Sequence, residues 1–372
     1  MPLQLHGRRG EGKGRLFRGR AFAKGNANGA DALTSKGTPD FMTATLPMPA
    51  EFAEQEWIWI GFPHDASLWE ESLVPAQEQI AAYANVVAET GQQVRLVVHD
   101  AANEMRARGL TSASVILERH PYGDIWLRDT GPLVVFDGSG RRYARKFRFN
   151  GWGGKYDDME GDQEVGGSMA EAAGLPLAQS DWILEGGAID TDGSGLVVTT
   201  EQCLLNANRN PGLSRAQVEE RLRSELGLRD VLWLGEGLAC DHTDGHVDNL
   251  ARFIAPGELA IPLPTGADDP NATVYEDARA RARGFGLMIR DVPSPGRIEA
   301  ADLVEPASYM NFAICNAVVV VPTYGTVHDA DGVAAIGELF PDRATVGLPA
   351  DAVLTGGGSF HCASQHVPKR PR

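Results

Sequence analysis

Four short stretches of the sequence combine side chains that can act as nucleophile, acid, base or charged ligand. Each stretch contains or adjoins glycine, so each is typical of a turn or loop rather than of an apolar core segment. The stretches are WLRDTGP with Arg128 and Asp129, WILEGGAID with Glu185, DHTDGHVDNLARF with His242, Asp244, His246, Asp248 and Arg252, and GGGSFHC with Cys362. Loops at the ends of strands are where proteins usually mount functional groups.

Cys362 has the surroundings of a reactive thiol. A free thiol has a pKa of about 8.5, so a nucleophilic cysteine needs a histidine or a cationic neighbour to form the thiolate. His246 or His361 can supply that help. Several carboxylates near a thiolate suit a cationic electrophile, and two carboxylates can hold a planar guanidinium group through paired hydrogen bonds. Asp129 and Asp248 fit that role.

Three other interpretations stay open at this point. Each stretch alone can be structural: the Arg and Asp of WLRDTGP can pair, the glutamate of EGG can cap a turn, and glycines can end a hairpin. His242 and His246, four residues apart, can ligate Zn²⁺ or Mn²⁺ as in a metal-dependent ureohydrolase. Gly245 disfavours the regular helix that this requires. A non-catalytic relative should lack one of the groups, and none is missing.

The net charge of −16 is distributed unevenly over the 372 residues. Residues 1–40 hold eight Lys/Arg and three Asp/Glu, a balance of +5, which leaves −21 for the rest. Such an acidic body repels nucleic acid and attracts a small cationic substrate, although acidic surfaces also serve solubility. Residues 1–41 are rich in Gly and Arg and predict a disordered arm, or a gene start placed too early, with Met42 as the true start.

Cysteine usage and hydropathy indicate a cytoplasmic protein. The four cysteines show no CxxC spacing, so neither a zinc knuckle nor a disulfide framework is predicted. There is no run of 18 apolar residues and no apolar segment of a secretory signal, so we expect no contact with a membrane.

From Glu51 onward, strand-like and helix-like segments alternate in roughly five units of about sixty residues each. The first unit pairs strands at 56–63 and 93–100 around a helix ending at Gly91. Further helices are predicted near 163–173, 214–227, 274–284 and 330–339, each preceded by strand-like segments such as IWLRDTGPLVVFD, GLVVTT, LAIPL and NAVVVVPTYG. This is an α/β pattern with internal repetition and without a linker.

The motifs resemble those of the agmatine deiminase and bacterial peptidylarginine deiminase family. DIWLRDTGP, FNGWGGKYD, EGGAID, TDGHVDNLARF, NFAICNAVVVVPTYG and GGGSFHC occur in the family's order, and MPAEFAEQEWIWIGFPHD is similar to its opening. The resemblance covers residues 47–366. It implies a pentein fold, a single catalytic domain of five strand-and-helix units around a pseudo-fivefold axis, with the active site at the centre.

The resemblance also implies roles for single residues. The nucleophile falls on Cys362, the histidine acid and base on His246, and the guanidinium-binding carboxylates on Asp129 and Asp248. Glu185 matches the carboxylate near the histidine and the substrate, and Trp126 of DIWLRDTGP is placed at the substrate. No metal or cofactor is implied, and His242 and His361 receive no role. Independently of the resemblance, a homo-oligomer is an expectation for this protein.

Two segments depart from the family's agmatine-specific pattern and bear on substrate choice. Such members usually read GGGNIHC followed by TQQ, whereas this chain reads GGGSFHCASQH. The acidic DMEGDQEVGG replaces an aromatic stretch. Because acidic surroundings disfavour the α-carboxylate of free arginine, agmatine ranks first, giving N-carbamoylputrescine and ammonia, and peptidyl-arginine ranks second.

Overall fold

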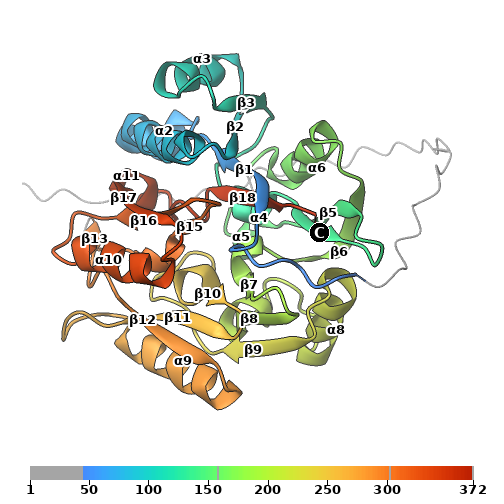
Figure 1. The fold of residues 1–372 in the computed structure, drawn as a ribbon, viewed down its shortest axis with the longest axis vertical. Coiled ribbons are helices and arrows are strands. Elements are labelled where there is room, and N and C mark those ends of the chain that lie inside the picture. Colours follow the sequence, from blue (N-terminus) through green and yellow to red (C-terminus); the bar gives the residue numbers. More distant parts are fainter. Residues whose placement is uncertain (1–44, 157–158, 301–302, 371–372) are drawn as a thin grey trace, which may run out of the picture. The chain divides into compact units, whose positions relative to one another are not determined.

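We describe residues 45–156, 159–300 and 303–370 of a computed structural model. The basic arm expected at residues 1–41 lies outside the described residues. Within the described range the chain is mixed α/β, as the sequence predicts (Figure 1).

Five sheets share one pairing scheme, in which the second strand is antiparallel to the first and parallel to the third. They are β18 (Ser364–Pro368), β1 (Gln55–Gly61), β2 (Gln93–Val98) and β3 (Ile116–Arg119); β4 (Leu133–Phe136), β5 (Arg142–Arg148) and β6 (Leu177–Ile183); β7 (Ile189–Thr191), β8 (Leu196–Thr200) and β9 (Asp230–Leu234); β10 (Arg252–Ala255), β11 (Glu258–Leu263) and β12 (Met288–Pro293); and β15 (Ala313–Ile314), β16 (Val318–Thr323) and β17 (Ala344–Pro349). A separate hairpin joins β13 (Glu299–Ala300) to β14 (Leu303–Val304).

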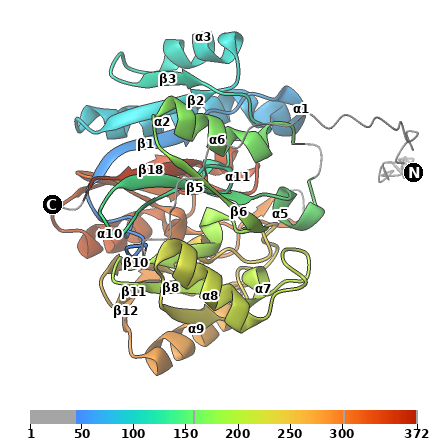
Figure 2. The ribbon, with the colours of Figure 1, turned by 90° about the vertical axis from the view of Figure 1, so that its right-hand side faces the viewer.

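The first sheet is built from both ends of the described chain. Its antiparallel strand is β18, the last strand in the sequence, and Ile58 of β1 lies opposite His366 of β18. Figures 1 and 2 both show β1 beside β18. This pairing places the residues just before β18, including Cys362, next to segments that follow much earlier strands.

A helix connects each pair of parallel strands, because parallel neighbours need a long crossover connection. These helices are α2 (Leu73–Glu89), α3 (Ala101–Leu110), α6 (Asp162–Ala172), α8 (Arg215–Leu226), α9 (Ala272–Phe285) and α10 (Asp329–Leu339). In Figure 1 they lie toward the outside, while β7, β10, β15 and β18 lie nearer the middle. The helices predicted from sequence are therefore confirmed, with ends shifted by a few residues.

Short helical segments occur where the sequence suggested continuous strands. The stretch IWLRDTGPLVVFD is not one strand: Leu127–Thr130 form α4, and β4 starts only after Gly131 and Pro132. In WILEGGAID, β6 ends at Ile183 and β7 begins at Ile189, and the short helical segment η2 (Gly186–Ala188) lies between them. The other short elements are α1 (Ala66–Trp69), α5 (Gly151–Gly154), α7 (Glu201–Leu204), α11 (Asp351–Leu354), η1 (Glu70–Ser72), η3 (Val247–Asn249) and η4 (Tyr309–Asn311).

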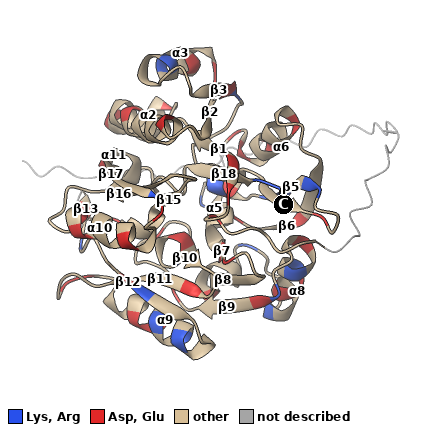
Figure 3. Ribbon diagram, viewed as in Figure 1, with Lys and Arg blue, Asp and Glu red and all other residues tan. Residues whose placement is uncertain are grey.

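Apolar side chains fill the space between sheets and helices, with Trp59, Tyr83 and Phe312 among the largest fully buried ones. Figure 3 shows basic and acidic positions interspersed along α3, α8 and α9, so these helices present no stripe of a single charge. Among the described helices, none is both long and apolar enough to cross a membrane.

Candidate active site

The short segments that interrupt the strands bring the predicted site residues together. Asp129 lies in α4, Glu185 precedes η2, His246 precedes η3 and Asp248 lies within it. Cys362 comes from the turn before β18. All five side chains are at least nine-tenths buried.

Three of these groups converge on Gly187. A Cβ atom added to this glycine would lie 2.6 Å from Nδ1 of His246, 3.0 Å from Oδ1 of Asp129 and 3.1 Å from Oδ2 of Asp248. His246 Nδ1 itself lies 3.8 Å from Asp129 Oδ1. The EGG motif thus leaves room for the histidine and both aspartates where any larger residue would displace one of them.

The Cys362 thiol touches a carboxylate and an amide. Its Sγ lies 3.4 Å from Oδ2 of Asp248 and accepts a hydrogen bond from Nδ2 of Asn311 at 2.9 Å. Asn311 Oδ1 also accepts from the backbone N–H of Cys362 at 3.2 Å. Burial, and then the charges of Asp248 and Asp129, raise the pKa of the Cys362 thiol well above its ordinary value. In the absence of a bound cation, the thiol is therefore protonated at neutral pH.

Asn311 is a site residue that sequence reasoning missed. It stands in the motif NFAICNAVVVVPTYG, which contributes to the family resemblance, but an uncharged amide does not by itself indicate catalysis. The position of Asn311 in this motif, shortly before a strand, is the sequence feature that could have indicated it.

The two aspartates differ in their surroundings. Asp129 accepts hydrogen bonds from the backbone N–H of Gly187 at 2.9 Å and from Nε1 of Trp152 at 2.8 Å. Burial raises its pKa, and the charges of Asp248 and Glu185 add to this against the lowering effect of His246. Burial also acts to raise the pKa of Asp248, but a hydrogen bond and a charge from His361 hold it below its ordinary value.

His246 is held in its protonated form. Burial lowers the pKa of its imidazole, but the charge of Asp129, the neighbouring Cys203 and the charge of Glu185 together raise that pKa well above its ordinary value. A proton is therefore available on this ring at neutral pH.

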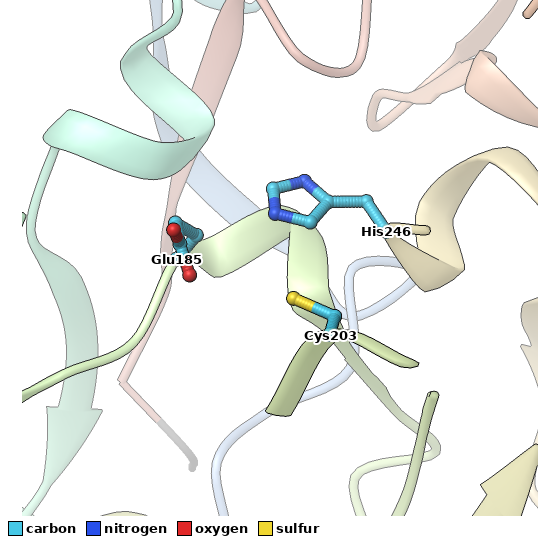
Figure 4. A group of neighbouring side chains, drawn as sticks. All are labelled: Glu185, Cys203 and His246. Carbon is cyan, nitrogen blue, oxygen red and sulfur yellow. The ribbon is translucent and has the colours of Figure 1, made fainter. Parts of the chain in front are cut away.

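Glu185, Cys203 and His246 form a compact buried cluster, in which the carboxylate and the thiol flank the imidazole ring (Figure 4). One ligand atom from each lies within 4.8 Å of the others, a grouping that suits a metal ion. The neighbouring cation is Arg209, whose Nε donates to Oε1 of Glu185 at 2.6 Å. This grouping includes only His246 of the HTDGHVD segment, so the described residues do not gather the histidine pair proposed for a metal-dependent ureohydrolase.

A cavity of about 160 Å³ opens onto the thiol. Its lining residues are Leu68, Trp69, Asp124, Trp126, Asp129, Trp152, Tyr156, Met159, His242, Thr243, Thr355, Gly356, Gly357, Gly358 and Cys362. Trp126, predicted to lie at the substrate, forms part of the wall. Among these residues none is Lys or Arg, so the cavity favours a cationic or apolar guest over an anionic one.

The glycines of GGGSFHC allow the indole of Trp126 to lie against the backbone. A Cβ added at Gly356 or Gly358 would come within 2.8 or 2.6 Å of the Trp126 ring. Asp124 fixes this ring by accepting a hydrogen bond from its Nε1 at 2.7 Å. Burial raises the pKa of Asp124 to about 6.

The two unassigned histidines occupy different environments. His242 is exposed at the cavity, with Nδ1 3.2 Å from the hydroxyl of Tyr156. His361 is buried and lies between Asp248 and Glu51.

The segment DMEGDQEVGG, which differs from the agmatine-specific pattern, contributes to the wall of the cavity. Met159 lines the cavity, and the buried Asp162 accepts a hydrogen bond from the backbone N–H of Gly123 at 2.7 Å. Burial raises the pKa of Asp162 to about 7. Residues 157–158 lie outside the described residues.

The family model for the Porphyromonas-type peptidyl-arginine deiminases matches residues 47–368. The chain belongs to that family. This confirms the resemblance predicted from the ordered motifs.

Relatives and solved structures extend the likeness over most of the chain. The agmatine deiminase of Stutzerimonas stutzeri is 35% identical over 357 residues, which cover 86% of this chain and 95% of that protein. The agmatine deiminase of Ectopseudomonas mendocina is 35% identical over 351 residues, with 86% and 95% covered. The structure of the agmatine deiminase of Enterococcus faecalis superposes with a TM-score of 0.84 at 31% identity, covering 91% of this chain and all of that one.

The ion pair with Asp129 should set the protonation of His246. Asp129→Asn removes the charge that contributes most to raising the pKa of His246, so that pKa should fall by about 1 to 3 pH units. NMR titration of ring-labelled histidine measures this, with Asp181→Asn, an exposed residue paired with Arg221, as the control that changes nothing. An unchanged His246 pKa in Asp129→Asn would show that another group keeps the ring protonated.

Proposed function

We propose that the chain hydrolyses a guanidino group, converting agmatine and water to N-carbamoylputrescine and ammonia through a covalent adduct on Cys362. The observation that carries this proposal is the placement of Cys362 beside Asp248, with Asp129 and a protonated His246 converging on the same point. The agmatine deiminases similar to the chain support this substrate class. Peptidyl-arginine is the second candidate substrate, because the chain belongs to the Porphyromonas-type peptidyl-arginine deiminases.

Substrate binding supplies the charge that the thiol needs. In the free protein, Asp129 and Asp248 oppose formation of a thiolate at Cys362. A guanidinium group held by the two carboxylates neutralises their negative charge and places its own positive charge beside the sulfur. The pKa of the thiol then falls, and the thiol proton is lost to water when the substrate binds.

The first half of the reaction forms the adduct. The thiolate adds to the guanidinium carbon and gives a neutral tetrahedral intermediate. His246 donates its proton to one terminal nitrogen, the C–N bond breaks and ammonia leaves. A cationic thiouronium remains on Cys362, still facing Asp129 and Asp248, while Glu185 stays next to the neutral imidazole.

The second half releases the product. His246, now a base, takes a proton from a water molecule whose oxygen adds to the thiouronium carbon. Collapse breaks the C–S bond and releases the N-alkyl urea, the thiolate and one proton. His246 is again protonated and the site is ready for another cation. These steps use only side chains of this chain, so no metal or cofactor enters the proposal.

The cavity supports agmatine over free arginine. Trp69, Trp126 and Trp152 offer aromatic faces to an alkyl chain and, by cation–π attraction, to a terminal ammonium. The α-carboxylate of arginine would meet no Lys or Arg among the described lining residues. Burying that carboxylate without a partner is costly.

We further infer that the five sheets are arranged as a pentein propeller around a pseudo-fivefold axis, as a single catalytic domain over residues 47–366. Their common pairing scheme supports this arrangement. A cytoplasmic location, a homo-oligomeric state and a disordered arm or misplaced gene start at residues 1–41 remain predictions.

The test offers the purified protein agmatine, free arginine and a peptide with an internal arginine, and measures ammonia and ureido product separately. We expect agmatine to be the best substrate and Cys362→Ala to lower turnover by more than ~10³-fold, because the covalent route is lost. Cys315→Ala, which alters another buried thiol outside the cavity, is the control and should retain turnover. Full activity of Cys362→Ala would end the proposal, and preference for the peptide would select the second substrate.

Gly187 provides a test of the convergence. Gly187→Ala places a methyl group 2.6 Å from His246 Nδ1, so the ring or an aspartate must shift and kcat/KM should fall by about 10²-fold. Gly167→Ala is the matched control, since its Cβ meets nothing closer than 3.8 Å. If both variants retain full kcat/KM, the convergence of His246, Asp129 and Asp248 beside Gly187 is not important for the reaction.

A further inference from the structure

His361 lies between two buried carboxylates. Its Nδ1 is 2.7 Å from Oδ2 of Asp248, and its Nε2 is 2.7 Å from Oε2 of Glu51. Only 2% of the residue is exposed, so water does not take the place of either partner. His361 stands in the motif GGGSFHC, but neither the family resemblance nor the mechanism above assigns a role to its side chain.

The geometry determines the charge of the His361 ring. An ionised carboxylate only accepts hydrogen bonds, and an imidazole donates from both nitrogens only when it is protonated. Both carboxylates act as acceptors toward other donors as well: Glu51 accepts from Arg252 and Arg128, and Asp248 Oδ2 accepts from the Cys362 thiol. His361 is therefore an imidazolium.

Glu51 is a firm anchor for this imidazolium. Its Oε2 also accepts from Nη2 of Arg252 at 2.9 Å and from Nη2 of Arg128 at 3.3 Å. Its Oε1 accepts from the backbone N–H of Ile314 at 2.8 Å. The backbone N–H of His361 in turn donates to the carbonyl of Asn311 at 3.1 Å. Main chain and side chain of His361 are thus both fixed.

Because His361 contacts only one oxygen of Asp248, the two carboxylate oxygens have different environments. Oδ2 is occupied by His361 and faces Cys362 Sγ at 3.4 Å. Oδ1 is buried and, within the described part of the chain, has no hydrogen-bond partner. A buried carboxylate oxygen without a donor is costly unless a ligand supplies one.

We propose that His361 is a positioning residue that, as an imidazolium held between Glu51 and Asp248, keeps one oxygen of Asp248 against the Cys362 thiol and leaves the other open to the guanidinium group of the substrate. The inference rests on the proposed function, because it assigns the open oxygen to that substrate. It adds a residue that acts through Asp248 rather than on the reacting atoms.

Two substitutions separate positioning from simple core packing. The amide nitrogen of Asn corresponds in position to Nδ1 of histidine, and that of Gln to Nε2. His361→Asn therefore keeps a donor toward Asp248 without the charge, whereas His361→Gln keeps a donor toward Glu51 and leaves Asp248 unpaired. His366→Gln is the matched control, because His366 is also buried, on β18, and its ring lies beside Arg128.

We expect His361→Gln to lower kcat/KM for agmatine by roughly 10² to 10⁴-fold, as for a buried ion pair that loses one partner. His361→Asn should lose less than about tenfold, since its hydrogen bond to Asp248 remains. His366→Gln should resemble the unaltered protein. Melting temperatures, measured in parallel, should fall by similar amounts in the two His361 variants.

The pH profile gives a second readout that a structural role would not change. Loss of the imidazolium lets the pKa of Asp248 rise, so the acid limb of kcat/KM should move to higher pH in His361→Gln, and by less in His361→Asn. The charged or titratable groups around the ring are Glu51, Arg128, Asp190, Asp248, Arg252, Cys362 and His366.

The inference would be overturned if the Asn and Gln variants lost kcat/KM equally, in proportion to their loss of melting temperature, and if the acid limb of the pH profile did not move. His361 would then be a packing residue. Unaltered activity in His361→Gln would overturn it as well. A different result, in which the unaltered protein releases no ammonia from any of the three guanidino substrates, would refute the proposed function and the inference together.

Discussion

Charge balance among buried groups is the constraint on which the centre of this molecule depends. An ionised group taken out of water costs several kcal/mol unless an opposite charge and hydrogen bonds replace the solvent. Five buried carboxylates connected to the site pair with five buried cations: the carboxylates are Glu51, Asp129, Glu185, Asp190 and Asp248, and the cations are Arg128, Arg209, His246, Arg252 and His361. A further buried carboxylate, Asp124, lines the cavity and accepts hydrogen bonds from the indoles of Trp69 and Trp126. Ionising Cys362 therefore adds a negative charge in excess. A bound guanidinium removes that excess, which links recognition of the cation to activation of the nucleophile.

The fold supplies this balance by joining segments that are distant in the sequence. Glu51 and His361 are separated by 310 positions and meet because β18 pairs with β1. Asp129, Glu185 and Asp248 come from the short turns and helices that interrupt successive sheets. Glycine at 187 and 358 keeps the backbone free of side chains where the histidine, the aspartates and the indole of Trp126 approach. Rigid sheets and small residues together hold the charged atoms at fixed distances.

The sequence predicts the alternation of strands and helices because each crossover helix carries its own periodicity. It also indicates Cys362, His246, Asp129, Asp248, Glu185 and Trp126, since glycine-flanked polar motifs in a known order are informative in themselves. It does not indicate Glu51, Asn311 or Cys203, whose importance comes only from neighbours far along the chain. Local pattern also misjudged the residues around α4, where apolar side chains that resemble a strand flank a short helical turn at the site.

We infer that a bound cation, rather than a basic group of the free protein, causes the Cys362 thiol to ionise. The direct measurement is the thiol pKa of Cys362, obtained from ultraviolet thiolate absorbance against pH as the difference between the unaltered protein and Cys362→Ala. It is taken with and without a saturating, unreactive amidinium salt. We expect a pKa above the ordinary value of ~8.5 in the free protein and a fall of more than about one pH unit with the amidinium. A free-protein pKa at or below the ordinary value, unchanged by the cation, would contradict it.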